Sequence, residues 1–341
     1  MTASGRVAYA NARVRALKSH LFGREMVGRL RTDHDVSASN ADDAGTDREV
    51  GVSGDLSTLA ARRFRHLLTC YRVVLSSYPS GQSLFQALVR LHEIENLKLA
   101  WRARTIGHPF ERWGSLWRPL GDLESVRLED CRDQTSLSGL VAALRATPYG
   151  AMADATWRAH ADDLLACELA LDRWASAALV RAAASLSRRE STARDLALAV
   201  VRERDLNLLR RGAQAFGLAP ETVLGGLVLL PRELPPDELS RLATWTPRGG
   251  RFLNTWPRVW GVTTTDRPAD WEALLLAVKR ARRRACRRAF LGSPYCLGPA
   301  VALLLLQEEE VRAVVSIREA SGRSDAGPLL ERVLAASNMG A

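Results

Sequence analysis

A short acidic pattern that occurs three times constrains the fold of this 341-residue chain more than any other feature. Its copies, 110 and 105 residues apart, are Glu93-Ile94-Glu95, Glu203-Arg204-Asp205 and Glu308-Glu309-Glu310. A glycine follows the second acid of each copy by 12 positions, at Gly107, Gly217 and Gly322. An interval of this length is the size of a domain, whereas solenoid repeats are much shorter. The pattern therefore predicts three related units.

Apolar residues at helical spacing flank each copy, so each segment is predicted to be one long helix that ends at the glycine. Ala, Leu and Arg dominate the chain, and aromatic residues make up only 6% of it. This composition favours helices over strands. The predicted fold class is all-α, with helical units at residues 1–121, 122–233 and 234–341.

The repeated acids do not form a reactive pair, because residues two positions apart on a helix point roughly 200° apart. We expect them to pair with arginines on neighbouring helices or to cap backbone groups. The structural set is Glu93, Glu95, Asn96, Glu203, Asp205, Asn207, Glu308 and Glu310.

Sequence motifs of common enzyme classes are missing. The chain has no phosphate-binding GxxxxGK[ST] loop, no GxGxxG and no GxSxG nucleophile turn. Its six histidines are scattered and it has no CxxC pair, so no zinc site is predicted. We therefore expect no catalytic residue, metal or cofactor. The five scattered cysteines indicate free thiols in the cytoplasm, and no apolar run is long enough to span a membrane.

The net charge of +10 is concentrated in residues 279–288. As a helix, this stretch places Leu274, Val278, Ala281, Ala285 and Ala289 on one stripe and its arginines on the remaining surface. A solvated face, an acidic protein partner, anionic headgroups and nucleic acid all fit such a surface. The candidate contact residues are Arg280, Arg283, Arg284, Arg287 and Arg288.

Residues 31–55 are polar, acidic and almost without large apolar side chains. Such a segment buries too little surface to offset its ordering entropy, so a flexible loop is predicted there.

Five segments together resemble the family of the C subunit of V-type (A-type) ATPases, whose eukaryotic relative is the d subunit. They are residues 9–18, 93–98, 144–150, 203–211 and 299–317. The chain departs from the family pattern in residues 31–55, in the heavy basic stretch and in the third acidic copy, which lacks an asparagine.

The resemblance implies a non-catalytic, all-α funnel of three domains related by pseudo-threefold symmetry. It also implies a peripheral place on the inner face of the membrane, between the central-stalk subunits and the proteolipid ring, in transport of H⁺ or Na⁺. Two alternatives stay open, since fold-level analogy is weak ground for function. One is a nucleic-acid-binding protein that uses residues 279–288, and the other is a helical enzyme with a cleft between repeats.

Overall fold

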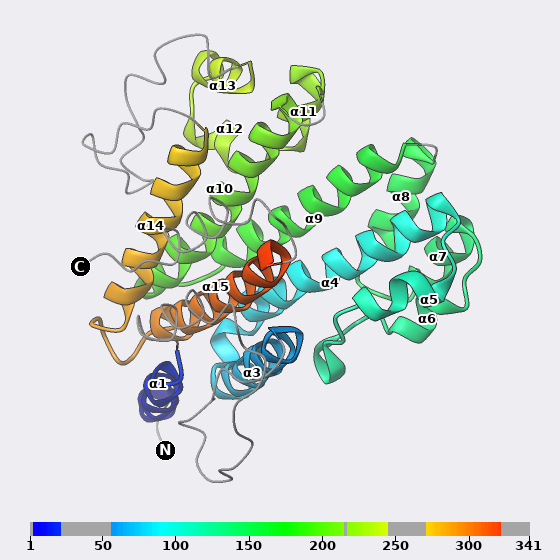
Figure 1. Cartoon of the computed structure of the whole chain (residues 1–341). Helices are drawn as coiled ribbons and strands as arrows, with labels where there is room; N and C mark the ends of the chain where they lie inside the picture. The colour runs from blue at the N-terminus through cyan, green and yellow to red at the C-terminus, as the bar shows by residue number, and fades with distance from the viewer. Residues whose placement is uncertain (1–2, 22–55, 162, 215–216, 245–270, 322–341) are drawn as a thin grey trace. The chain divides into compact units, whose positions relative to one another are not determined.

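The computed structural model describes residues 3–21, 56–161, 163–214, 217–244 and 271–321. Every regular element in these ranges is a helix, which confirms the all-α prediction (Figure 1). None of the helices in these ranges is both long and apolar enough to cross a membrane. The predicted loop at residues 31–55 and the glycine at Gly322 lie outside the described residues.

The chain forms two compact units, each built from segments that are distant in sequence. Unit 1 comprises Met1–Pro79, Arg189–Leu196 and Leu276–Ala341, and unit 2 comprises Ser80–Arg188 and Ala197–Leu275. Helices α10 (Ser191–Gln214) and α14 (Trp271–Ala289) contribute residues to both units. The three-unit division at residues 121 and 233 stays a prediction.

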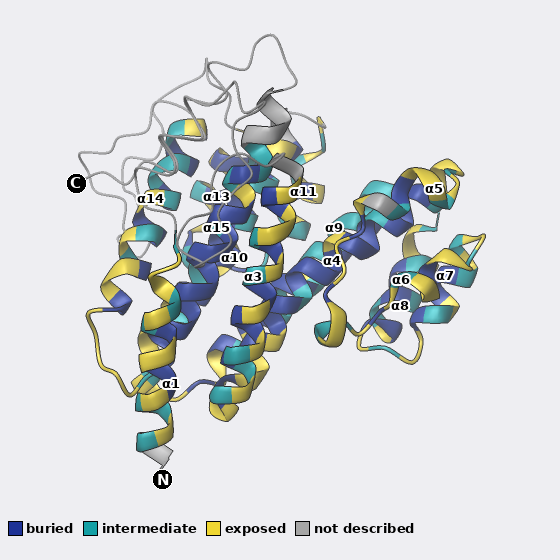
Figure 2. Cartoon of the chain, turned by 60° about the horizontal axis from the view of Figure 1, so that its bottom comes forward, coloured by how far each residue is buried: buried dark blue, intermediate teal, exposed yellow. Residues whose placement is uncertain are grey.

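Unit 1 is organised around α15 (Gly298–Ser321), which packs against α3 (Leu56–Ser77) and α1 (Ala3–Lys18) (Figure 1). Residues 300–306 of α15 are all buried and all apolar. A helix that is apolar on every side is stable only inside a core, so this segment must be enclosed by its neighbours. Figure 2 shows the same contrast, with the buried α15 beside the largely exposed face of α1.

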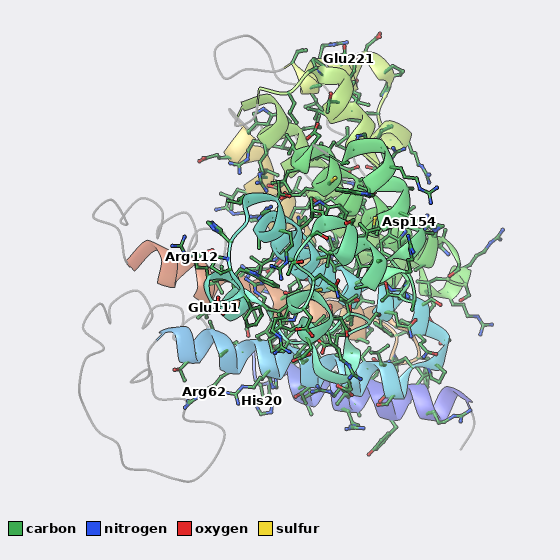
Figure 3. The ribbon with its side chains drawn as sticks, turned by 90° about the vertical axis from the view of Figure 1, so that its right-hand side faces the viewer. His20, Arg62, Glu111, Arg112, Asp154 and Glu221 are labelled. Carbon is green, nitrogen blue, oxygen red and sulfur yellow. The ribbon has the colours of Figure 1, made fainter. Side chains whose placement is uncertain are left out.

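The end of α1 is also tied to α3. The His20 ring lies 5.8 Å from the His66 ring, and the Arg63 guanidinium donates to the His20 carbonyl at 2.9 Å. His20 is labelled in Figure 3, beside the α3 residue Arg62. These contacts hold the residues that follow α1 against α3.

Unit 2 is organised around two long helices, α4 (Gln82–Ile106) and α9 (Leu164–Ala184), which pack along one another. Large side chains on these two helices, such as Phe85 and Trp101 on α4 and Leu171 on α9, are completely or almost completely buried. The shorter helices of this unit are α5 (Phe110–Trp113), α6 (Leu128–Arg132), α7 (Leu137–Leu144), α8 (Gly150–His160), α11 (Pro220–Gly226), α12 (Leu230–Glu233) and α13 (Pro236–Ala243). Four 3-10 turns complete the described elements: Pro79–Gly81, Gly114–Leu116, Gly121–Leu123 and Arg188–Glu190.

A left-handed glycine ends the first repeated helix, as the sequence pattern predicts, and a second left-handed glycine lies shortly after the second repeated helix. Gly107 follows α4 with φ of 71°, and its N–H lies against the carbonyls of Ala103 and Arg104. Gly217 follows α10 with φ of 57°. Residues with a Cβ adopt this conformation at a cost, which explains why glycine stands at both positions.

We expect Gly107→Ala to lower the free energy of unfolding by about 1 kcal/mol, because alanine is strained in the left-handed region. Gly225→Ala is the matched control: a Cβ meets nothing within 4 Å at either glycine, but Gly225 lies in α11 without a positive φ. Alanine should stabilise that helix by up to about 1 kcal/mol. Urea unfolding of both variants measures the difference, and equal effects would contradict the assignment.

Candidate functional site

The first acid of the first copy holds a loop of unit 2 in place. Glu93 on α4 is 1% exposed, and its Oε1 accepts the N–H groups of Ser125 and Val126, the latter at 2.8 Å. Its Oε2 accepts the hydroxyl of Tyr149. Burial, followed by the nearby Glu93 carboxylate, raises the pKa of Tyr149, so the phenol stays a donor. One carboxylate thereby joins α4, the loop before α6 and the start of α8.

Asn96, almost one turn further along α4, makes a second tie to the same region. Its Nδ2 donates to the Arg118 carbonyl at 2.8 Å, and its Oδ1 accepts the Arg118 N–H at 3.0 Å. The amide therefore satisfies both backbone groups of one residue in a segment that has no helical partner for them.

In the second copy the second acid, Asp205 on α10, has the backbone role. Asp205 is 3% exposed, and its Oδ2 accepts the N–H groups of Val228, Leu229 and Leu230 at 3.2, 2.7 and 3.0 Å. These are the donors at the start of α12, where backbone N–H groups lack intrahelical partners. Burial raises the pKa of Asp205 to about 6, although the three backbone hydrogen bonds act in the opposite direction.

The neighbouring residues of α10 complete this copy. Arg202 forms two hydrogen bonds with Glu233 at the other end of α12, at 2.9 and 2.6 Å. Glu203 is 4% exposed, and its backbone carbonyl accepts from Asn207 Nδ2 at 2.9 Å. Asp205 and Arg202 therefore hold both ends of one short helix.

Glu95 points away from Glu93, as the two-residue spacing predicts, and joins a network of charges across α4, α9 and α10. Lys98 Nζ lies 2.9 Å from Glu95 Oε1 and 3.1 Å from Asp172 Oδ1. Arg204 Nη2 lies 2.5 Å from the same Asp172 oxygen and 3.9 Å from Glu95. Burial alone would raise the pKa of Glu95, but Lys98 and Arg204 outweigh it and lower the pKa. Arg102 and Glu168 add a further bridge between α4 and α9.

The third copy makes its contacts within unit 1. Glu310 pairs with Arg63 of α3 at 3.7 Å, and Glu308 pairs with Arg312 one turn along α15 at 2.5 Å. The residue between them, Glu309, accepts from Arg282 at 2.8 Å and Arg283 at 2.7 Å, both on α14. The acids of α15 thus tie this helix to α3 and to α14.

The basic stretch is helical, as predicted, but its arginines do not all lie on the surface. Arg282 is only 5% exposed, and the prediction that the arginines cover the remaining surface is wrong for it. The side chain of Arg283 is 11% exposed and also engages Glu309. So many arginines within three helical turns cannot all avoid the buried stripe. Arg280, Arg284, Arg287 and Arg288 are exposed.

Sequence reasoning missed a clasp that centres on Asn11. This α1 residue is 0% exposed, and its Nδ2 donates to the carbonyls of Pro294 at 2.7 Å and Cys296 at 3.0 Å. Its Oδ1 accepts the Tyr78 hydroxyl at 2.9 Å. Arg15 adds a contact to the Phe290 carbonyl at 3.3 Å. A usable sequence sign is the spacing of three between Asn11 and Val14, which places the asparagine on the same helix face as an apolar residue, and both are buried in the structure.

The acids Glu168 and Asp172 of α9 were also missed. Their spacing of four places both on one face of a helix that is otherwise rich in Ala and Leu, and this pattern was a usable sign. Within the described part of the chain, no three His, Cys, Asp or Glu side chains come together in a way that could hold a metal. The polar groups described above join helices and loops to one another.

The raised pKa of Asp205 predicts a pH dependence of stability. The folded pKa is about 6 against an ordinary 3.8, so the folded state binds the proton more tightly between these values. Stability from this group is complete below pH 4 and is lost as the pH rises through 6, by on the order of 2 kcal/mol. Asp205→Asn should remove that slope. Urea unfolding of both proteins from pH 4 to pH 7 measures it, and parallel pH profiles would contradict the prediction.

Asn11→Ala should lower the free energy of unfolding by about 2–4 kcal/mol, because the buried Tyr78 hydroxyl loses its acceptor and the carbonyls of Pro294 and Cys296 lose their donor. Asn207→Ala removes a single local bond to a helical carbonyl and serves as the control, with an expected loss below about 1 kcal/mol. Thermal unfolding compares the two variants. Equal losses would mean that the clasp contributes no more than an ordinary side-chain bond.

One comparison with known proteins identifies a family. A family model described as ATP synthase (C/AC39) subunit matches residues 10–323, a range that contains all three acidic copies and the Asn11 clasp. No curated protein matches the sequence. Because the matched range covers far more than half of the 341 residues, the chain belongs to the C/AC39 family, a family of non-catalytic subunits of rotary ATPases.

Proposed function

We propose that this chain is the rotor subunit that couples the central stalk of a V-type or A-type ATPase to its membrane proteolipid ring. Its partners are the central-stalk subunits and the ring, and it lies peripherally on the inner face of the membrane. It contributes to ATP-linked transport of H⁺ or Na⁺ without catalysing a reaction itself. The family match over residues 10–323 is the observation that carries this proposal.

The contacts within each unit suit a part that transmits torque. Hydrogen bonds are directional, and a helix joined to its neighbour by buried ion pairs resists sliding more than one held by apolar contact alone. In unit 2 the Lys98–Asp172–Arg204 contacts join three helices. In unit 1 Glu309 and Glu310 join α15 to α14 and α3. The repeated acids are therefore structural in this proposal.

The arrangement proposed for the whole chain is a funnel of three repeat domains related by pseudo-threefold symmetry, at residues 1–121, 122–233 and 234–341. Its support is the recurrence of one element: α4, α10 and α15 each carry the acidic pattern, and glycines end the first two. Related units around a central axis would give the stalk and the ring large complementary surfaces.

Deletion of this chain from its native host should abolish ATP-driven ion transport in inverted membrane vesicles, because the stalk would no longer be connected to the ring. Transport should return when the full chain is expressed again. A tagged full chain, recovered from detergent-solubilised membranes, should bring down the proteolipid and central-stalk subunits, which mass spectrometry identifies.

Two results would overturn the proposal. The first is unchanged ATP-driven transport in the deletion strain. The second is a pull-down that enriches nucleic acid, or that enriches none of the ATPase subunits. Recovery of nucleic acid would redirect attention to the exposed arginines of α14.

A further inference from the structure

The loop between α14 and α15 exposes apolar side chains to an unusual extent. Leu291 is 86% exposed and Tyr295 is 61% exposed, and Figure 2 colours this loop as exposed. Tyr9 of α1, two residues before the Asn11 clasp that binds this loop, is 63% exposed. Single exposed apolar residues are common, but three on adjoining segments indicate a surface that meets a partner.

The loop does not owe this exposure to a lack of contacts. Asn11 fixes the Pro294 and Cys296 carbonyls, and Arg15 Nη2 reaches the Phe290 and Gly292 carbonyls at 3.3 and 3.5 Å. On its far side, the N–H of Leu297 donates to Glu190 at 2.6 Å. These hydrogen bonds hold the loop in place while Leu291 and Tyr295 stay exposed to solvent.

Basic residues surround these apolar side chains. Residues 276–307 contain seven Lys or Arg residues and no Asp or Glu, and residues 3–21 contain four and none. Arg287 and Arg288 are exposed immediately before the loop. Lys18 is exposed too, with its Nζ 4.7 Å from the Phe290 ring centre. Positive charge therefore lies beside the apolar tip, while the Glu190 carboxylate accepts the Leu297 N–H at the other end of the loop.

We propose that this surface, the basic loop face of Tyr9, Lys18, Arg287, Arg288, Leu291 and Tyr295, binds the headgroup layer of an anionic lipid bilayer. Side chains as exposed as Leu291 protrude, and they do not line a groove that a protein segment could fill. A bilayer interface accepts leucine and tyrosine side chains without shape complementarity, and anionic headgroups attract the surrounding cations. The proposal does not depend on the coupling role, because it concerns lipid and the isolated chain.

Sedimentation of the full-length chain with lipid vesicles tests the proposal. The chain should bind vesicles of phosphatidylglycerol and phosphatidylcholine, and should bind pure phosphatidylcholine at least about tenfold more weakly. Salt should weaken the binding, because exposed charges are screened. Excess soluble glycerol phosphate should not displace the chain, because the apolar residues require a bilayer.

Two double variants separate the charge from the apolar tip. Arg287→Gln with Arg288→Gln should weaken binding to anionic vesicles by roughly ten- to thirtyfold. Leu291→Ser with Tyr295→Ser should weaken it by about tenfold or more, and this loss should persist at high salt.

Matched controls come from unit 2. Arg112→Gln with Arg232→Gln removes two exposed charges, and Ile106→Ser with Leu116→Ser removes two apolar residues that are 61% and 62% exposed. Arg112 is labelled in Figure 3. Neither control should change binding by more than about twofold, and circular dichroism should show that all four variants keep their helices. Failure to bind anionic vesicles, equal binding to neutral ones, displacement by glycerol phosphate, or equal losses in the controls would each overturn the proposal.

Discussion

Two buried carboxylates, Glu93 and Asp205, organise the folding of the segments around them. A carboxylate taken out of water is costly unless strong donors replace the lost hydration. Here the donors are backbone N–H groups of chain segments that follow 23 to 33 positions later. Those segments are irregular or begin short helices, so their N–H groups have no partners of their own. The carboxylate oxygens and the N–H groups of the loop are therefore each other's hydrogen-bond partners. This pairing fixes the position of the loop against the helix.

The hydrogen bonds between a buried carboxylate and loop N–H groups occur in two copies of the acidic pattern, but at different positions of that pattern. The first acid has this role in α4 and the second acid has it in α10. A shift of two positions rotates a side chain by roughly 200°, so the loop that each copy binds must approach a different face of its helix. An alignment of the α4 and α10 copies by sequence and an alignment by their backbone contacts thus differ by two residues. Such a difference between the copies is expected for carboxylates that serve as buried hydrogen-bond acceptors. A carboxylate that took part in a reaction would need the same position in each copy.

The sequence predicted the features that depend on local chemistry. Helix type, the left-handed Gly107 and Gly217, and the divergence of Glu93 and Glu95 follow from periodicity and backbone geometry. Features that depend on which distant segment arrives could not be predicted. The partners of Asn11 and the burial of Arg282 belong to this group. A polar residue on a helix is predicted to be exposed to solvent unless the segment that packs against it is known. A charged residue on an otherwise apolar helix, such as Asp172 on α9, is the sequence sign from which the charge network of α4, α9 and α10 could have been predicted.

The Asn11 clasp has a consequence for biosynthesis. Its partners Pro294 and Cys296 lie 283 and 285 positions away, so they leave the ribosome on the order of tens of seconds after α1. Throughout that interval the buried face of α1, with Ala10 and Val14, has no loop to receive it. Until then α1 has, among the described residues, only its earlier contacts, with α3 and with Tyr78. Nascent chains that stop short of residue 290 therefore leave part of the apolar face of α1 uncovered, and incompletely folded chains of this kind are substrates of chaperones and proteases.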